Sequence, residues 1–143
     1  MEATSARERF ASARVARLAT VTADGAPHLV PVTFALLDRK TIVTAVDHKP
    51  KRTVALRRLD NIAANPSVCV LAAHYSEDWS ELWWVRADGT ATVVPPGSRP
   101  GLRTAAVGAL AERYPAYRDR PPDGALIVIL VRRWSGWSAT ARV

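Results

Sequence analysis

Hydrophobic and polar residues alternate along residues 15–46 in a pattern that predicts β-strands. The segment "VARLATVTADGAPHLVPVTFALLDRKTIVTAV" divides into three strands separated by two turn signals. The first signal is Asp24–Gly25, a pair that favours a tight hairpin, and the second is the polar stretch 37–40. Pro31 falls inside the second predicted strand. Because proline cannot donate to a strand ladder, it indicates a sheet edge, a bulge or a neighbour other than a strand.

A helical period replaces the alternation in residues 51–64, which Pro50 precedes and Asn65–Pro66 ends. One face of this predicted helix is apolar and carries Ala55, Leu56, Leu59, Ile62 and Ala63. Lys51 and Arg58 are seven residues apart, so they lie on one line at the edge of that face. These two cations can reach a group held beside the core, whereas Arg57 points more toward solvent.

The other segments predict a barrel-forming sheet with few helices. They are a short helix at 3–14, a strand at 67–74, a helix at 102–114 ended by Pro115, an apolar strand at 125–134 that suits burial on both sides, and a last strand or tail. Residues 82–95 are either a hairpin at Asp88–Gly89, which the local sequence favours, or one long strand with a glycine bulge. We therefore expect an α+β fold, mainly β, in a single domain 1–143: a six- to seven-stranded antiparallel barrel, closed or partly closed.

Composition narrows the class of partner. The chain has 143 residues, 20 Lys and Arg against 13 Asp and Glu, and a net charge of +7. Such a surplus favours an anionic partner: nucleic acid, a membrane surface, or a phosphorylated or carboxylated small molecule. Cys69, the single cysteine, stands between Val68 and Val70 and is expected to be a buried strand residue. The charged N-terminal stretch lacks a long apolar run, which favours the cytoplasm over export or a membrane span.

Motifs for catalysis by side chains are absent from the sequence. His28, His48 and His74 have no metal-ligand spacing, and neither a P-loop nor a G-x-G-x-x-G motif occurs. We therefore expect no metal, and because the cations do not form a long stripe, no nucleic acid. Core packing is expected to explain most of the five tryptophans. Trp83 and Trp84, however, are adjacent on a predicted strand and must face opposite sides, so one of them needs an interface or a flat ligand.

Three segments together resemble a known family. "TVTADGAPHLVPVTF", "TIVTAV" and the cation-rich helix ending in "NIAANPSVCVL" resemble the pyridoxamine 5′-phosphate oxidase-like split β-barrel flavoproteins, the FMN-binding split-barrel type. The segment "EDWSELWWVRADGTATV" is similar to the F420-dependent branch of this class, the flavin/deazaflavin oxidoreductases. The resemblance covers roughly residues 8 to 137.

The resemblance implies a homodimer with two cofactor sites at the subunit interface. The cofactor ring would lie along two strands, at Pro31, Val32, Thr33, Phe34, Thr44, Ala45 and Val46. The phosphate would meet Lys49, Lys51, Arg57 and Arg58. Arg58 stands where the family often has a lysine, and arginine keeps the charge and can bind phosphate through two parallel hydrogen bonds. Trp84 would cover the ring from the second subunit.

The implied activity is hydride transfer between F420 and a small organic acceptor, with solvent or a hydroxyl such as that of Thr33 supplying the proton. The carboxylates of the F420 tail would suit several cationic clusters: Lys49 to Arg58, then Arg86, then Arg132 and Arg133. Two alternatives stay open: an FMN-dependent enzyme of the same type, and a non-catalytic split barrel that binds flavin or haem. A membrane partner is not expected.

Overall fold

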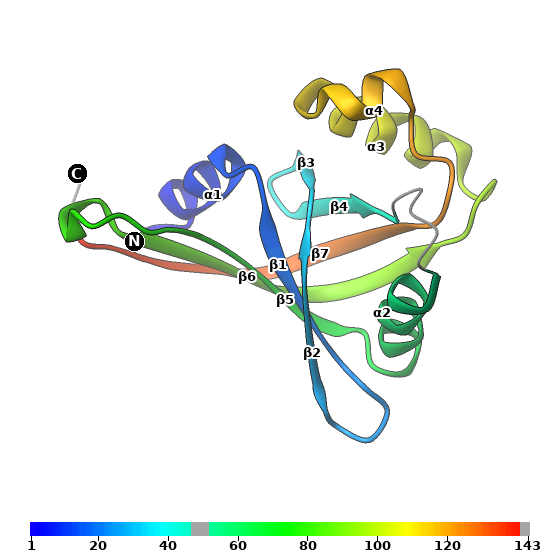
Figure 1. Cartoon of the computed structure of the whole chain (residues 1–143), viewed down its shortest axis with the longest axis horizontal. Helices are drawn as coiled ribbons and strands as arrows, with labels where there is room; N and C mark the ends of the chain where they lie inside the picture. The colour runs from blue at the N-terminus through cyan, green and yellow to red at the C-terminus, as the bar shows by residue number, and fades with distance from the viewer. Residues whose placement is uncertain (47–51, 141–143) are drawn as a thin grey trace.

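The computed structural model of the chain describes residues 1–46 and 52–140, and the side chains of all of these except 52–56. Seven strands form one antiparallel sheet in the order β2-β1-β5-β6-β7-β4-β3 (Figure 1). They are β1 (Ala16–Val21), β2 (Pro27–Val32), β3 (Ala35–Asp38), β4 (Thr41–Ala45), β5 (Ser67–His74), β6 (Trp83–Val94) and β7 (Leu126–Ser138). The helices are α1 (Ala3–Ser12), α2 (Arg52–Ala64), α3 (Pro100–Arg113), α4 (Pro115–Asp119) and the 3-10 helix η1 (Trp79–Glu81). The expected α+β split-barrel fold is confirmed.

The two edge strands of this sheet are consecutive in the chain. β2 and β3 lie at opposite ends of the strand order, yet only Thr33 and Phe34 separate them. Three Cα–Cα steps span at most roughly 11 Å, so the sheet must curl until its edges come close. Among the described strands β2 pairs with β1 alone and β3 with β4 alone, which leaves the barrel split between its two edges. The prediction of three strands in residues 15–46 was therefore wrong: the strand expected between the two turn signals breaks at Thr33–Phe34 into β2 and β3.

Two local signals in this part of the chain, Asp24–Gly25 and Pro31, predicted the structure correctly. Gly25 has a φ of +92°, which glycine tolerates best, and its N–H donates to the Thr22 carbonyl at 3.0 Å in the β1–β2 hairpin. Pro31 pairs with Arg17 on the edge strand β2, so its missing N–H costs no ladder bond to a further strand. The proline thus marks a sheet edge, as expected.

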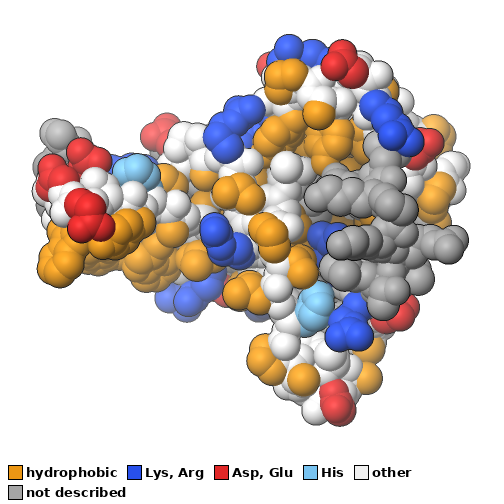
Figure 2. Space-filling view, viewed as in Figure 1, with side chains coloured by type: hydrophobic (Ala, Val, Ile, Leu, Met, Phe, Trp, Pro, Cys, Tyr) orange, Lys and Arg blue, Asp and Glu red, His pale blue; other side chains and the backbone are white. Residues whose placement is uncertain are grey.

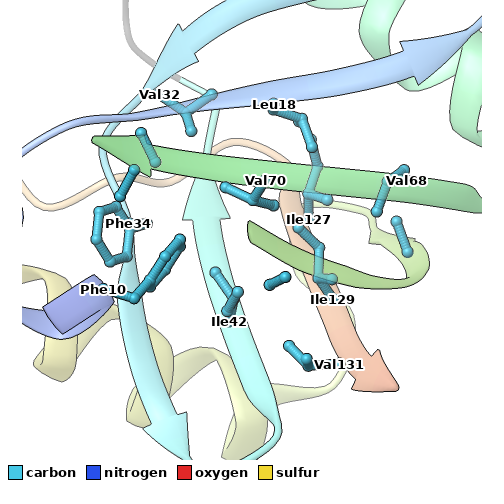
Figure 3. Close-up of a cluster of buried hydrophobic side chains, with 14 of the residues drawn as sticks. Phe10, Leu18, Val32, Phe34, Ile42, Val68, Val70, Ile127, Ile129 and Val131 are labelled. Carbon is cyan, nitrogen blue, oxygen red and sulfur yellow. The ribbon is translucent and has the colours of Figure 1, made fainter. Parts of the chain in front are cut away.

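The core fills the inside of the barrel and continues under a helix pair. Inside the barrel, Phe10 of α1 packs on Phe34, with ring centroids 4.6 Å apart, beside Ile42, Val70 and Ile127 (Figure 3). A second cluster joins β3 and β4 to α3 and α4 through Ala35, Val43, Ala45, Val94, Ala106, Leu110, Tyr117 and Leu126. β4 is consequently buried on both faces, and β3 packs on both faces through Ala35, Leu36 and Leu37, which fixes the position of the sheet edge that they form.

Residues 83–94 form one long strand rather than a hairpin. β6 pairs with β5 over its first eight residues and with β7 over its whole length, with a register shift between Asp88 and Gly89. A Cβ on Gly89 would collide with the Leu130 carbonyl oxygen and press on Ile129 Cγ2. The glycine therefore allows a close approach of backbones at an irregularity in the ladder. Pairing on both sides overrides the turn preference of Asp88–Gly89.

The C-terminal third also differs from expectation. β7 continues from Leu126 to Ser138 as a single strand, and Leu130 is 56% exposed, so this run is not buried on both sides throughout. Pro115 ends one helix and begins the next, α4, as its first residue. Proline suits that position because the first helical N–H has no intrahelical acceptor. The sequence pattern predicted that the helix ends at Pro115 and gave no signal for α4.

Substituting Gly89 by alanine should destabilise the protein. We expect the free energy of unfolding of Gly89→Ala to fall by about 1–3 kcal/mol, because the new Cβ meets β7 backbone that cannot move freely. The matched control is Gly108→Ala on α3, where a Cβ meets no atom within 4 Å and should stabilise the helix by about 0.5–1 kcal/mol. Urea unfolding of both variants decides the matter. Equal midpoints for Gly89→Ala and the parent would contradict the close approach.

Candidate functional site

The link between β2 and β3 brings together two segments of the expected cofactor site. Continuing the β3–β4 register, in which Ala35 lies opposite Val43, puts Phe34 opposite Thr44 and Thr33 opposite Ala45. The N–H of the next residue, Val46, donates to the Ala125 carbonyl at 3.0 Å, which ties this end of β4 to the segment that leads into β7. By this register Phe34 and Thr44 follow the last β3–β4 pair on the barrel side of the sheet, and Thr33 and Ala45 follow on the side of α3 and α4.

Two tyrosines from the helix pair hold this link. The Phe34 N–H donates to the Tyr114 hydroxyl at 3.2 Å, and that hydroxyl donates to the Arg14 carbonyl at 2.9 Å. The Thr33 and Tyr117 hydroxyl oxygens are 2.9 Å apart and share a hydrogen bond. The two tyrosine rings meet edge to face, with centroids 5.8 Å apart. We call Tyr114 and Tyr117 the tyrosine pair.

Sequence reasoning missed the tyrosine pair. The two residues flank Pro115 and lie about 80 positions from the link that they contact, as the sequence separations of 80 and 84 show. No local pattern reports a contact over that distance. The one available signal was the spacing itself, since two tyrosines three residues apart around a proline are placed to present both hydroxyls to one region.

Most of the predicted ring-binding residues have buried side chains. Phe34, Thr44, Ala45 and Val32 are at most 6% exposed, whereas Thr33 and Val46 are half-buried and Pro31 is exposed. A ligand at this site would thus contact the side chains of Thr33, Val46 and Pro31 before those of the other four. Thr44 Oγ1 is buried and makes no hydrogen bond to the described residues. An unpartnered buried hydroxyl carries a desolvation cost that a ligand or water could relieve.

The expected phosphate-binding cations are on α2 or just before it. Lys49 and Lys51 lie outside the described residues. Of the other two, Arg57 is exposed and Arg58 is half-buried. The helix that carries them is held in place one turn further on, where buried Asn61 donates to the buried Thr20 hydroxyl at 3.0 Å. The backbone of the α2 cations is therefore fixed relative to β1.

Trp83 and Trp84 point to opposite sides of β6, as expected. Trp83 turns toward α1, where the Arg9 guanidinium lies 5.6 Å from its ring centroid. Trp84 pairs across the ladder with Trp137 and carries the Arg86 guanidinium 5.9 Å above its ring. Pro31 and Arg86 are three strand steps apart, or roughly 14 Å. Trp84 lies further along β6 and does not join the link within one subunit.

Directly paired residues project from the same side of a sheet. We call the side that carries the following three rows of paired residues the outer face. One row runs Pro31, Arg17, Leu71, Arg86 and Ser135; the neighbouring rows add Leu29, Cys69, Asp88 and Arg133, and then Ala73, Trp84 and Trp137. Leu29 is 65% and Trp137 48% exposed. Figure 2 shows hydrophobic side chains gathered along the lower side of the arm in which β5 and β7 end and β6 begins.

The exposure of the tryptophans corrects one expectation. Trp79 is 68% exposed, and Trp83, Trp84 and Trp134 are half-buried, so core packing does not account for most of the five. Cys69 is likewise only half-buried on the outer face rather than fully buried. Burial, and next the neighbouring Asp88 carboxylate, raise the pKa of its thiol, which disfavours the reactive thiolate.

Comparisons with solved structures place the fold among known proteins. A conserved hypothetical protein of Mycobacterium tuberculosis, Rv2991, is 23% identical, with 97% of this chain and 86% of that chain covered and a TM-score of 0.73. A FAD-binding protein of Mesorhizobium loti is 22% identical, with 95% and 92% covered and a TM-score of 0.69. HutZ, the haem storage protein of Vibrio cholerae, is 18% identical, with 94% and 90% covered and a TM-score of 0.68. At these identities the likeness shows the fold alone.

Two further findings complete the comparison. Among curated proteins no sequence matches this chain. None of the helices in the described residues has both the length and the apolar composition that crossing a membrane requires. The family model for pyridoxamine 5′-phosphate oxidase, by contrast, matches residues 3–138. Nearly the whole chain is covered by this match, so the protein belongs to the pyridoxamine 5′-phosphate oxidase family.

Proposed function

We propose that the protein is an oxidoreductase that binds a flavin-type cofactor at the link and exchanges a hydride with a small organic acceptor. The observation that supports this proposal is the gap in strand pairing at Thr33–Phe34, where the half-buried Thr33 lies at the edge of the split barrel. Helix α2, which follows β4 in the chain and carries Arg57 and Arg58, supplies cations suited to a phosphate.

In this proposal the chain's residues bind and position, and the cofactor supplies the redox chemistry when bound. Thr33 and Val46 border the ring, Arg58 holds the phosphate, and the buried cluster behind β3 and β4 keeps the wall rigid. The described residues hold no group of three or more His, Cys, Asp or Glu that could bind a metal ion. In this proposal solvent or the Thr33 hydroxyl supplies the proton.

F420 is the proposed cofactor, and the segment Glu77–Val93, which resembles the F420-dependent branch, supports this choice. The expectation that several cationic clusters bind the carboxylates of the F420 tail has less support within one subunit. The Val131 N–H donates to the Lys40 carbonyl at 2.6 Å, and Trp134 Nε1 donates to the Arg39 carbonyl at 3.1 Å. Arg132 and Arg133 therefore lie at the turn end of β4, away from the helix that would hold the phosphate. FMN is the alternative, and a flavin is also favoured by the neighbour named as FAD-binding.

Direct competition tests the cofactor. At low salt, where charge contributes most, F420 should displace bound FMN, and the loaded protein should reduce an electron-poor acceptor. Tryptophan fluorescence quenching follows the binding. Tighter binding of FMN would overturn F420 while keeping the flavin-type proposal. Binding of haemin, with neither F420 nor FMN bound, would instead favour a haem-binding split barrel.

Arg58 should contribute directly to cofactor binding. Arg58→Ala removes a charge-assisted hydrogen bond to the phosphate, and we expect binding of F420 or FMN to weaken by roughly 1.5–3 kcal/mol. Arg57→Ala is the comparison, because its exposed neighbouring charge is screened and should matter less. Fluorescence titration gives both values. Unchanged affinity in Arg58→Ala would make this residue ordinary surface charge.

We also propose that two copies associate through the outer face, so that Trp84 of one subunit covers the cofactor ring of the other. The support is chemical: the face combines exposed Leu29, Pro31 and Trp137 with half-buried Leu71 and Trp84. Aromatic residues and arginine are enriched in protein interfaces. An obligate dimer of this kind is expected to bury more than about 2,000 Å² in total.

The dimer makes a measurable prediction. The parent should sediment as a dimer at micromolar concentration, and Trp137→Ser should shift it toward monomer and weaken cofactor binding together. A monomeric parent that binds cofactor with full stoichiometry would refute the shared site.

A further inference from the structure

We infer that the end of the arm of one copy docks on a basic patch of a second copy, through an exposed tryptophan and opposite charge. The inference rests on the proposed dimer for its second copy, and adds which surfaces meet and why salt weakens their contact. The arm tip is the segment 74–82, which joins β5 to β6 and contains η1. The turn patch consists of Arg39, Lys40, Arg132 and Arg133.

The arm tip presents two aromatic side chains on an ordered loop. Trp79 is 68% and Tyr75 65% exposed. The Asp78 carboxylate accepts from the Ser80 N–H at 3.1 Å and from the Ser80 hydroxyl at 2.7 Å, and the Thr140 hydroxyl donates to the Ser80 carbonyl. Exposed apolar surface of this size, held in place by hydrogen bonds, indicates a contact surface. Tryptophan is among the residues that contribute most to binding at interfaces.

The arm tip is acidic, although the protein as a whole is basic. It contains Glu77, Asp78 and Glu81, all exposed, and no lysine or arginine. The segment contributes −3 to the net charge of +7, so the other residues together carry +10. Hydrogen bonds from Ser80 hold the pKa of Asp78 below its usual value, which keeps this carboxylate charged at neutral pH. Figure 2 shows acidic and hydrophobic side chains together on the arm. A partner of the arm tip should therefore be cationic.

The turn patch is a cationic surface of matching size. Hydrogen bonds from β7 to the Arg39 and Lys40 carbonyls hold the β3–β4 turn beside Arg132 and Arg133. All four cations are exposed, and none of them forms an ion pair with a carboxylate in the described part of the chain. Asp38, which accepts from the Lys40 N–H at 2.9 Å, reduces the charge of this surface to +3. The patch thus balances the −3 of the arm tip.

The arm tip cannot reach the turn patch of its own chain. β7 runs as one strand from Arg133 to Ser138, which pairs with Trp83 next to the arm tip. Five strand residues span roughly 17 Å, and a strand paired with β6 cannot fold back on itself. A second copy related by a twofold axis offers its patch to the first arm tip and receives the other arm tip in return, so the contact closes on itself. Because Arg133 and Trp137 lie on the outer face, the two arms would run along the face proposed for the dimer.

The experiment measures the dissociation constant of the dimer by sedimentation, at low and at high salt, for the full chain and its variants. Trp79→Ser removes the exposed aromatic ring, Glu77→Lys reverses a charge of the arm tip, and Arg132→Glu reverses one of the turn patch. The matched control is Glu112→Lys, the same reversal at an exposed glutamate of α3, which lies away from the arm in Figure 1. Thermal unfolding of every variant reports on the fold.

We expect high salt, Trp79→Ser and each reversal of the arm tip or turn patch to raise the dissociation constant about tenfold. An equimolar mixture of Glu77→Lys with Arg132→Glu should recover to within about threefold of the parent, because each arm tip then meets a patch of opposite charge. Glu112→Lys should dimerise like the parent, and its mixture with Arg132→Glu should not recover.

A dimeric parent whose dissociation constant is unchanged by Trp79→Ser and by both reversals would overturn this inference and leave the proposed dimer standing. Failure of the mixture to recover would likewise mean that arm tip and turn patch do not meet. A monomeric parent would overturn the proposed dimer as well. If that monomer bound polylysine, and Glu77→Lys abolished the binding, the arm tip would belong to a basic partner other than this chain.

Discussion

The two-residue link between β2 and β3 is the constraint on which the rest of the structure depends. Because Thr33 and Phe34 join strands at opposite ends of the sheet order, the sheet has to bend into a barrel whose two edges stay unpaired with each other. Phe34 is fully buried, and burying a phenylalanine stabilises a fold by about 1.5–3 kcal/mol. Its ring meets Phe10 on one side, and the Arg113 guanidinium lies 4.8 Å from its centroid. Closure is thus maintained by packing and by the tyrosine pair rather than by a strand ladder.

A barrel closed in this way leaves backbone and hydroxyl groups at the seam that the sheet itself cannot satisfy. The Phe34 N–H donates to the Tyr114 hydroxyl, and the Thr33 hydroxyl shares a hydrogen bond with that of Tyr117. Thr44 Oγ1 has no hydrogen-bond partner among the described residues. The gap in pairing that the topology imposes is the place where we propose that a ligand binds, so the fold and the proposed site depend on the same few residues.

The sequence predicted what local physics decides and missed what long-range contacts decide. The sequence correctly predicted the alternating strands, the Asp24–Gly25 turn, the edge position of Pro31 and the strand Ser67–His74. The break at Thr33–Phe34 was not, because those residues are compatible with a continuous strand and only the barrel separates them. Gly89 misled for the opposite reason, since its local preference for a turn yields to pairing with β5 and β7. For the proposed site, the resemblance named residues 33–34 and 44–46. The contact of Tyr117 with Thr33 could not be predicted, because it depends on how α4 packs.

The outer face combines charged residues with apolar ones, and two of the charges are paired with each other. Arg86 Nε lies 3.2 Å from Asp88 Oδ1, on one strand, and the same guanidinium lies over the Trp84 ring. Burying one of these charges alone would be costly, but the pair is already formed within a subunit. Covering the face would then desolvate a satisfied pair and leave Trp84 and Trp137 to contribute apolar area. An ion pair in an interface contributes more to the alignment of the subunits than to their affinity. In the proposed dimer, Arg86 and Asp88 would therefore fix the alignment of the two copies, and the tryptophans would supply most of the affinity.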